Sequence, residues 1–270
     1  LMAPILFFLG IPPSIAVSTE ATQICAASVS GSLAHFRRGN LDIKMGGLLV
    51  AGGLIGSTIG VFTFKWLITL GSVDLVIQLF YVVFLGGVGG LMFLESLQAM
   101  LRRRAGKRVS HKRRHGFMHG LPFRTKFPRS KLYISAILPV TVGFGVGFLS
   151  AIMGVGGGFI MVPAMIYLLG MPTLVVVGTS LFTIIFVTAN NTLQHAWFNG
   201  TVDLVLAGLL LLGGVIGAQI GVRLSGRFNA EQLRILLALI VLAVCFKILT
   251  DLLIGGPAVQ FSFGGGAGHA

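Results

Sequence analysis

The sequence predicts an all-α integral membrane protein with about seven to eight transmembrane helices, in two homologous repeats with glycine-broken helices. Three observations carry this prediction: the apolar composition, the distribution of charge, and an internal duplication. Of the 270 residues, 55% are hydrophobic and only 10% are charged, and the mean hydropathy is +0.95. A soluble domain carries roughly 25% charged residues, so this composition suits a chain whose solvent is hydrocarbon.

Apolar segments long enough to span a bilayer follow one another along the chain, each without an amphipathic stripe. Their predicted ranges are 14–36, 45–68, 75–97, 134–153, 173–197, 204–224 and 233–254. The stretch 1–9 is similar to the end of a further segment. We therefore expect the sequence to lack its true start, and the first repeat to be incomplete at its N-terminus.

Residues 134–169 do not fit a single crossing. As one helix they would be about 54 Å long, against a hydrocarbon core of about 30 Å. Four glycines, Gly154, Gly156, Gly157 and Gly158, interrupt this run, and Pro163 follows them. The pattern predicts a broken helix or a re-entrant pair, with a new helix beginning near Phe159.

Positive charge is concentrated between the two apolar halves. Twelve of the 20 Lys and Arg residues lie between Arg102 and Lys131, a stretch that holds no Asp or Glu. Loops retained on the cytoplasmic side carry such an excess, so we expect a cytoplasmic connector over 98–132. It would join a first repeat at 1–97 to a second at 133–254, with a flexible Gly-rich tail at 255–270.

The same loop raises two alternatives. A solvated loop is favoured over a role in binding lipid headgroups or nucleic acid, because runs of like charge are usually just solvated, and no nucleic acid is expected as a partner. The helical spacing of His111, His115 and His119 would suit a metal, but their cationic neighbours disfavour one. No metal or cofactor is expected.

The two halves share a framework of Pro, Gly, His and Asp residues in register. The matched positions are Leu1–Pro4 with Ile160–Pro163, Gly10–Pro12 with Gly170–Pro172, Thr19 with Thr179, His35 with His195, Gly39 with Gly200, Asp42 with Asp203, and Gly52–Gly56 with Gly213–Gly217. Independent apolar helices would share Leu and Val by chance, but not this framework. The sequence therefore predicts a duplicated unit, an architecture common among secondary transporters.

These residues resemble the TauE/SafE family of sulfite exporters and organosulfur anion permeases. The resemblance rests on the stretch Gly143–Pro172, on Gly178–Ser180, on His195, Gly200 and Asp203, and on the glycines from Gly213 to Gly221. It implies a multi-pass protein of a bacterial-type inner membrane that moves sulfite, sulfonates or other small anions. The chain departs from the internal pattern at Glu20, which stands where the second copy has Ser180.

Several residues are candidates for binding the substrate anion. A helix that begins after the glycine break would present free N–H groups and a positive dipole end. Close helix packing is the alternative role of such glycines, and it is favoured for Gly52–Gly60 and Gly213–Gly221. The complete set of substrate-binding candidates is Gly154, Gly156, Gly157, Gly158, Thr179, Ser180, Thr183, Asn190 and Asn191. For the two Asn residues, pairing with another helix is slightly favoured over contact with substrate.

Four residues are candidates for coupling or gating: Glu20, Gln23, His35 and His195. An ionisable group inside an apolar segment indicates a function, unless it lies near the membrane edge. The histidines suit either a protonatable group at the mouth of a path or a structural role. Asp42 and Asp203 are expected to N-cap the helices that follow them.

The predicted function is secondary transport of a small anion. A passive anion channel is the alternative, and a membrane enzyme is disfavoured, because no paired carboxylates, Ser-His-Asp set, metal cluster or nucleotide-binding loop is found. A homo-oligomer is possible. The relative orientation of the repeats stays open: inversion would bring Arg223, Arg227 and Arg234 inside, whereas the family's four-plus-four helix count favours parallel copies.

Overall fold

A computed structural model describes residues 2–71, 73–104, 124–127, 129–130, 132–154, 156–200, 202–225 and 230–254. In chain order the elements are α1 (Met2–Phe8), α2 (Pro13–Arg37), α3 (Ile43–Thr69), α4 (Val73–Arg104), β1 (Arg124–Phe127), β2 (Leu132–Ser135), α5 (Ile137–Met153), α6 (Gly158–Tyr167), α7 (Thr173–Gln194), the π-helical turn η1 (His195–Asn199), α8 (Leu204–Ser225) and α9 (Ala230–Ile254). The His111, His115 and His119 group and the tail at 255–270 lie outside the described residues.

The outer surface of the helices is apolar. In the described part of the chain, three stretches are long and apolar enough to cross a membrane: Ile43–Thr69, Asp74–Leu91 and Val175–Asn199. Large side chains such as Trp197 and Val205 are 86% and 75% exposed. Exposed apolar surface of this extent suits lipid as the surrounding solvent. The chain is thus a helical membrane protein, while the count of seven to eight crossings stays a prediction.

Helices α3 and α5 pack through their backbones. A Cβ added at Gly52 or Gly56 of α3 would overlap the carbonyl groups of Val140 and Phe144 on α5. Glycine permits this approach because nothing projects between the two helices, as in other membrane-helix pairs. The predicted packing role of the glycines at 52–60 is confirmed for α3.

Helices α2 and α7 run antiparallel against each other. Residue numbers rise along α2 while those of the contacted residues fall along α7. Thr22 Oγ1 lies 3.4 Å from Thr192 Oγ1, and Cys25 Sγ lies 3.6 Å from the Ile185 carbonyl oxygen. Towards the two ends of this pair, the same hydrogen bond occurs twice. The Asp203 N–H donates to Thr19 Oγ1, and the Asp42 N–H donates to Thr179 Oγ1, both at 3.1 Å.

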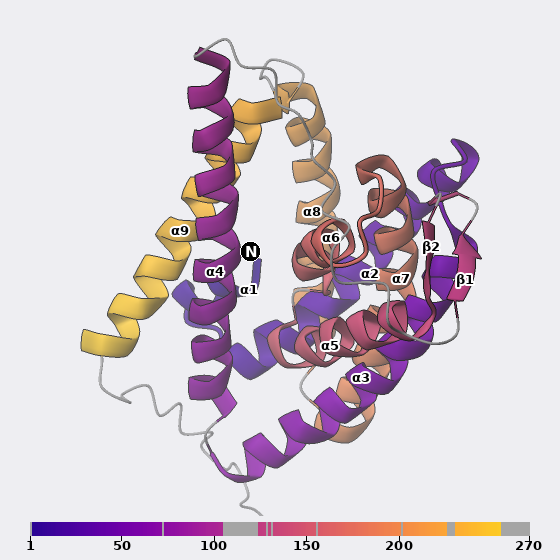
Figure 1. Ribbon diagram of the computed structural model, residues 1–270. Coiled ribbons are helices and arrows are strands. Elements are labelled where there is room, and N and C mark those ends of the chain that lie inside the picture. Colours follow the sequence, from indigo (N-terminus) through magenta and orange to yellow (C-terminus); the bar gives the residue numbers. More distant parts are fainter. Residues whose placement is uncertain are drawn as a thin grey trace, which may run out of the picture.

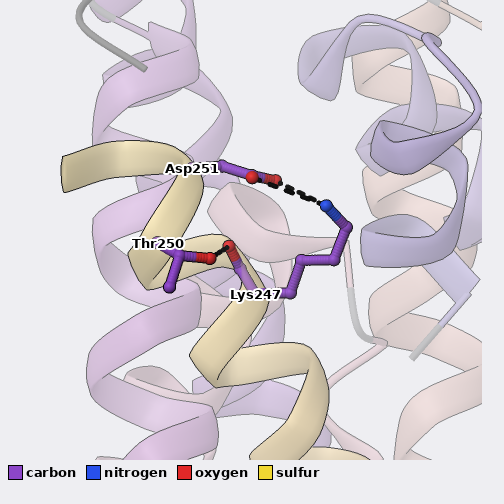
Figure 2. A network of polar contacts seen from close by, with 3 residues as sticks. All are labelled: Lys247, Thr250 and Asp251. Carbon is purple, nitrogen blue, oxygen red and sulfur yellow. Dashed lines mark hydrogen bonds and ion pairs between the residues drawn. The ribbon is translucent and has the colours of Figure 1, made fainter. Parts of the chain in front are cut away.

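Helices α4 and α9 lie side by side at one edge of the molecule, away from the β1–β2 hairpin (Figure 1). Their contact forms a buried cluster in which Ile77, Tyr81 and Leu85 of α4 meet Val241 and Ile248 of α9. On α9, the exposed Lys247 Nζ lies 3.3 Å from Asp251 Oδ2, and the Thr250 hydroxyl donates to the Lys247 carbonyl oxygen at 2.8 Å (Figure 2). Such exposed pairs contribute at most about 1 kcal/mol to stability.

The hairpin is a correction to the predicted all-α fold. Its strands occupy the end of the expected loop and the start of the apolar segment predicted at 134–153. Phe127 and Ile134 face inward and are buried, while Lys126 and its cross-strand partner Tyr133 are exposed. The antiparallel pairing of Arg124–Phe127 with Leu132–Ser135 places these two segments in a hairpin before α5 begins.

Both predicted N-caps are confirmed. Asp42 Oδ1 accepts from the Met45 N–H at 3.2 Å, and Asp203 Oδ1 accepts from the Leu206 N–H at 3.0 Å. Asp42 is buried and does more: its Oδ2 accepts the Ser130 hydroxyl at 2.7 Å and the Ser130 N–H at 3.1 Å. It therefore fastens the hairpin to the start of α3.

Candidate functional site

The predicted glycine break is present. Helix α5 ends at Met153, and Gly154, with φ of 68°, donates its N–H to the Ser150 carbonyl at 2.9 Å. Gly156 and Gly157 also have positive φ, of 68° and 74°, a region that other residues adopt with strain. Helix α6 then begins at Gly158, next to the predicted start at Phe159. The chain direction therefore changes between two short helices at this point.

The start of α6 leaves backbone donors available. Its N-cap is Gly157, which has no side chain and makes no side-chain capping hydrogen bond. The Gly157 carbonyl accepts from the N–H groups of Ile160 and Met161, at 3.1 and 2.6 Å. The N–H groups of Gly158 and Phe159 precede the first intrahelical bonds, as at any helix N-terminus. Partial positive charge collects there, and an anion is the ligand that it favours.

Three helices enclose the break with uncharged groups. A Cβ on Gly154 would lie 2.6 Å from Val17 Cα on α2, and one on Gly156 would overlap Ile24 of the same helix. A Cβ on Gly157 would lie 2.8 Å from Val146 Cγ1 and 3.6 Å from Ser150 Cβ on α5. Helix α7 approaches Gly158 through Ile184. The break is thus inside the protein, where irregular backbone can be tolerated at membrane depth.

Asn191 of α7 is linked to this region through Ser150, the α5 residue whose Cβ lies near Gly157. Its side chain is 1% exposed, and Nδ2 donates to Ser150 Oγ at 3.1 Å. Its Oδ1 has no hydrogen-bond partner among the described residues. Because the two ends of an Asn amide are interchangeable at the level of heavy atoms, one polar end is free in either orientation. Asn191 therefore has hydrogen-bonding capacity left for a ligand.

Asn190, by contrast, links α7 to helix α3. Its Nδ2 donates to Ser57 Oγ at 2.8 Å on α3, and its Oδ1 accepts from Gln194 Nε2 at 2.9 Å. Gln194 Nε2 also donates to Thr58 Oγ1 at 2.9 Å. Helix pairing, the alternative favoured from the sequence, is thus the structural role of Asn190, whereas Asn191 lies at the break.

His195 holds the end of α5. Its Nε2 lies 3.1 Å from the Ala151 carbonyl oxygen, and its Nδ1 lies 2.9 Å from Asn199 Nδ2. A carbonyl can only accept, so Nε2 carries the hydrogen and Nδ1 accepts from Asn199. The ring also meets Phe64 edge to face, with centroids 4.7 Å apart. Both nitrogens of the buried ring are therefore occupied in structural contacts.

The other coupling candidates lie on α2 and face different neighbours. Glu20 Oε2 accepts from the Ala3 N–H of α1 at 2.7 Å. The amide of Gln23 approaches Gly214 of α8, and its Oε1 has no partner among the described residues. His35 lies beside Gly178 at the beginning of α7, and its buried Nδ1 is likewise unpartnered there.

The hydroxyl candidates of α7 bond to backbone groups away from the break. Thr179 accepts from the Asp42 N–H, Thr183 donates to the Thr179 carbonyl at 3.0 Å, and Ser180 donates to the Val177 carbonyl at 3.0 Å. Sequence reasoning missed two other polar residues. Ser150 joins Asn191 to α5, and the Tyr81 hydroxyl of α4 donates to the Met153 carbonyl at the break. The one sequence signal for Ser150 is its position three residues before Met153, at the end of the helix that precedes the glycine break.

A helix broken at glycines and enclosed by other apolar helices, with the Tyr81 hydroxyl on the Met153 carbonyl at the break, is typical of helical membrane proteins of the transporter class. The family described as "Sulfite exporter TauE/SafE" matches residues 1–248, and the chain belongs to this family. The resemblance found from its glycine and His-Gly-Asp framework is thereby confirmed.

Individual relatives of the chain are also named as membrane transporters. The chain is 27% identical to "Probable membrane transporter protein YunE" of Bacillus subtilis, over 88% of this chain and 81% of the relative. It is 26% identical to YjnA of the same organism, over 92% and 90% of the two chains. A "Probable membrane transporter protein" of Xylella fastidiosa is 28% identical over 91% and 84%. No solved structure matches the chain.

Proposed function

We propose that this protein is a secondary transporter of a small anion, namely sulfite, a sulfonate or another organosulfur anion. The observation that carries the proposal is the start of α6, whose Gly158 and Phe159 N–H groups lie at a break enclosed by α2, α5 and α7. Broken helices in secondary transporters commonly bind anionic groups at such N-termini. The family and the printed names of the relatives support the class of function, and the substrate is our own assignment.

The antiparallel contact of α2 and α7 supports a transport mechanism. Thr19 and Thr179 are equivalent positions of the duplication, as are Asp42 and Asp203, and each Thr accepts the N–H of the other copy's Asp. Two equivalent helices that cross a membrane antiparallel are related by an axis in the membrane plane. We therefore propose inverted repeats, the arrangement from which alternating access arises by rocking one repeat against the other.

Inverted repeats also have a consequence for topology. They place Arg223 and Arg234 on the same side as the basic connector at 98–132, in keeping with the positive-inside rule. We propose that this side is the cytoplasmic face of a bacterial inner membrane. In a chain that lacks Cys25 and Cys245, single cysteines at Arg223 and at the exposed Lys126 should then react with an impermeant thiol reagent only after the membrane is opened. Labelling of the Arg223 position in sealed cells would contradict the inversion.

The test of function is flux in proteoliposomes. We expect saturable uptake of sulfite or a sulfonate that responds to a proton gradient, whereas a passive channel would conduct without such coupling. Gly157→Val should abolish flux, because the branched side chain requires a strained φ and meets Val146. The matched control is Gly145→Val on α5, where an added Cβ has nothing within 4 Å. No saturable flux of any anion would refute the proposal.

A second pair of variants tests the site without placing a bulky side chain at the break, so that loss of folding does not account for the result. Asn191→Ala should raise KM for the transported anion, because it removes the polar group left free beside the break. Asn190→Ala is the neighbouring control, and it should lower thermal stability with KM unchanged, because its partners are Ser57 and Gln194. Equal KM values for the two variants would remove Asn191 from the binding site.

A further inference from the structure

We infer that the β1–β2 hairpin and the adjoining corner between α2 and α3 (residues 36–44) form a binding surface for the headgroups of anionic phospholipids. This surface lies away from the glycine break, and the inference does not depend on the proposed transport of an anion. It is carried by the contacts that join the hairpin to the corner, by the exposed cations gathered there, and by the exposed apolar side chains beside them.

Hydrogen bonds fasten the hairpin to the corner. Arg129 Nη1 donates to the Gly39 carbonyl oxygen at 2.6 Å, and the Ser130 N–H and hydroxyl both donate to Asp42 Oδ2. Phe127 of β1 is buried in the same apolar cluster as the first turn of α3. The described end of the basic connector is therefore held against the start of a membrane helix, and its cations are held there with it.

Exposed cations flank these contacts on both segments. They are Arg37, Arg38, Lys44, Lys126 and Arg129. The sequence of the corner and of the hairpin contains a single acid, Asp42, which is buried and accepts the Met45 N–H and the Ser130 hydroxyl. The surface is therefore positive, and a negatively charged partner complements it.

Apolar side chains beside the cations favour a lipid over a free anion. Phe36, Ile43 and Tyr133 are 55%, 58% and 57% exposed. The first two adjoin cations of the corner in the sequence, and Tyr133 is the cross-strand partner of Lys126. A small soluble anion gains little from such a surface. A phospholipid presents its phosphate together with the start of its acyl chains, and aromatic rings are common at that level of a membrane.

The surface also lies at the right level of the membrane. The stretch Ile43–Thr69, which is long and apolar enough to cross a bilayer, begins within it, so the headgroups of the adjacent leaflet lie beside the corner. Clusters of about four to eight Lys and Arg next to a transmembrane helix are typical of sites for anionic lipids. The bond from Arg129 to Gly39 positions the guanidinium group, whose five N–H donors exceed what one carbonyl can use.

The experiment titrates phosphatidylglycerol into the full chain in detergent and follows the thermal unfolding midpoint, with zwitterionic phosphatidylcholine as the control lipid. The test variant combines Lys44→Gln with Lys126→Gln, which removes two exposed cations of the surface. The matched control combines Lys65→Gln with Lys247→Gln, which removes the same charge from the other end of α3 and from α9, at the edge of the molecule away from the hairpin (Figure 1). A third variant, Lys44→Arg with Lys126→Arg, keeps the charge. The lipid-free midpoint of each variant shows whether it folds as the wild type does.

We expect phosphatidylglycerol to raise the unfolding midpoint of the wild type well above the value in phosphatidylcholine. The test variant should bind phosphatidylglycerol at least about tenfold more weakly, because each Lys or Arg near an anionic surface contributes roughly fivefold. The matched control should lose less than about twofold, and the Arg variant should bind as the wild type does.

Three results would overturn the inference. They are equal effects of the two lipids on the wild type, equal losses in the test variant and the matched control, and full stabilisation by inorganic phosphate alone. The last result would assign the surface to a free anion. None of these measurements uses flux, so a failure of the proposed transport would leave the inference standing.

Discussion

Helices α3 and α8 begin from the same sequence pattern and end in different surroundings. Each follows an N-capping Asp and carries a Gly-Gly-x-x-Gly run, at Gly52–Gly56 and at Gly213–Gly217. On α3 these glycines lie against the backbone of α5. On α8, a Cβ added at Gly213 or Gly217 has nothing within 4 Å in the described part of the chain, and the nearby Leu212 and Ile216 are exposed.

The difference shows that a run of glycines permits another helix to approach closely. Whether close packing occurs depends on whether a helix of suitable shape lies against it. Helix α5 is a suitable partner because it brings glycines of its own. A Cβ on Gly143 or Gly147 would overlap the backbone of Leu49 and Gly53 on α3. Two such surfaces fit because both lack side chains at the contact. Helices α3 and α5 are therefore held together through their backbones.

The largest expected effect comes from filling this contact. Gly56→Val should destabilise the protein by more than about 3 kcal/mol, because the added atoms overlap the Phe144 backbone, which cannot rotate away as a side chain would. Gly217→Val, at the equivalent position of α8, should change stability by less than about 1 kcal/mol. Thermal unfolding of purified protein in detergent, with the monodisperse fraction as a second readout, measures both.

Two results would break this comparison. If Gly217→Val is as damaging as Gly56→Val, the α8 glycines are in close contact with another helix in the membrane. If Gly56→Val is tolerated, α3 and α5 do not approach as closely as their backbones indicate. Gly56→Ala separates steric overlap from the loss of flexibility, because Ala adds only the Cβ that meets the Phe144 carbonyl.

A smaller difference is expected between the two N-caps. Asp42→Ala removes the acceptor of the Met45 N–H and also leaves both donors of the buried Ser130 unpaired. The expected loss is about 2–4 kcal/mol. Asp203→Ala removes an exposed cap from the Val205 and Leu206 N–H groups, at about 1 kcal/mol.

Unfolding free energies from titration with a denaturing detergent would give both losses. Ser130→Ala is the matched control, since it removes the hairpin's hydroxyl contact while the cap of α3 stays. Its loss should lie between those of the two Asp variants. Equal losses for Asp42→Ala and Asp203→Ala would mean that the hairpin is not fastened to α3 through Asp42.

Much of the architecture could be predicted because it depends on local chemistry. Gly154 and Gly157 interrupt a helix in any surroundings, and Asp42 and Asp203 cap the helices that follow. The partners of polar side chains depend instead on which helices meet. No spacing in the sequence places His195 on the Ala151 carbonyl, or the Tyr81 hydroxyl on Met153. The hairpin was missed because Leu132, Tyr133 and Ile134 also continue an apolar run.

The smallest expected effect concerns the two reciprocal hydrogen bonds, and it is the sharpest test of the duplication. Thr179→Val and Thr19→Val each remove a buried hydroxyl and leave one Asp N–H without its acceptor, while the shape of the side chain is kept. Each should cost about 1 kcal/mol of unfolding free energy. Because the two sites are far apart along the α2–α7 pair, the double variant should lose the sum of the two values. Equal and additive losses follow from equivalent positions in inverted repeats. A loss at Thr179 with none at Thr19 would instead mean that the Asp203 N–H does not depend on Thr19, and that the two ends of the α2–α7 pair are held by different contacts.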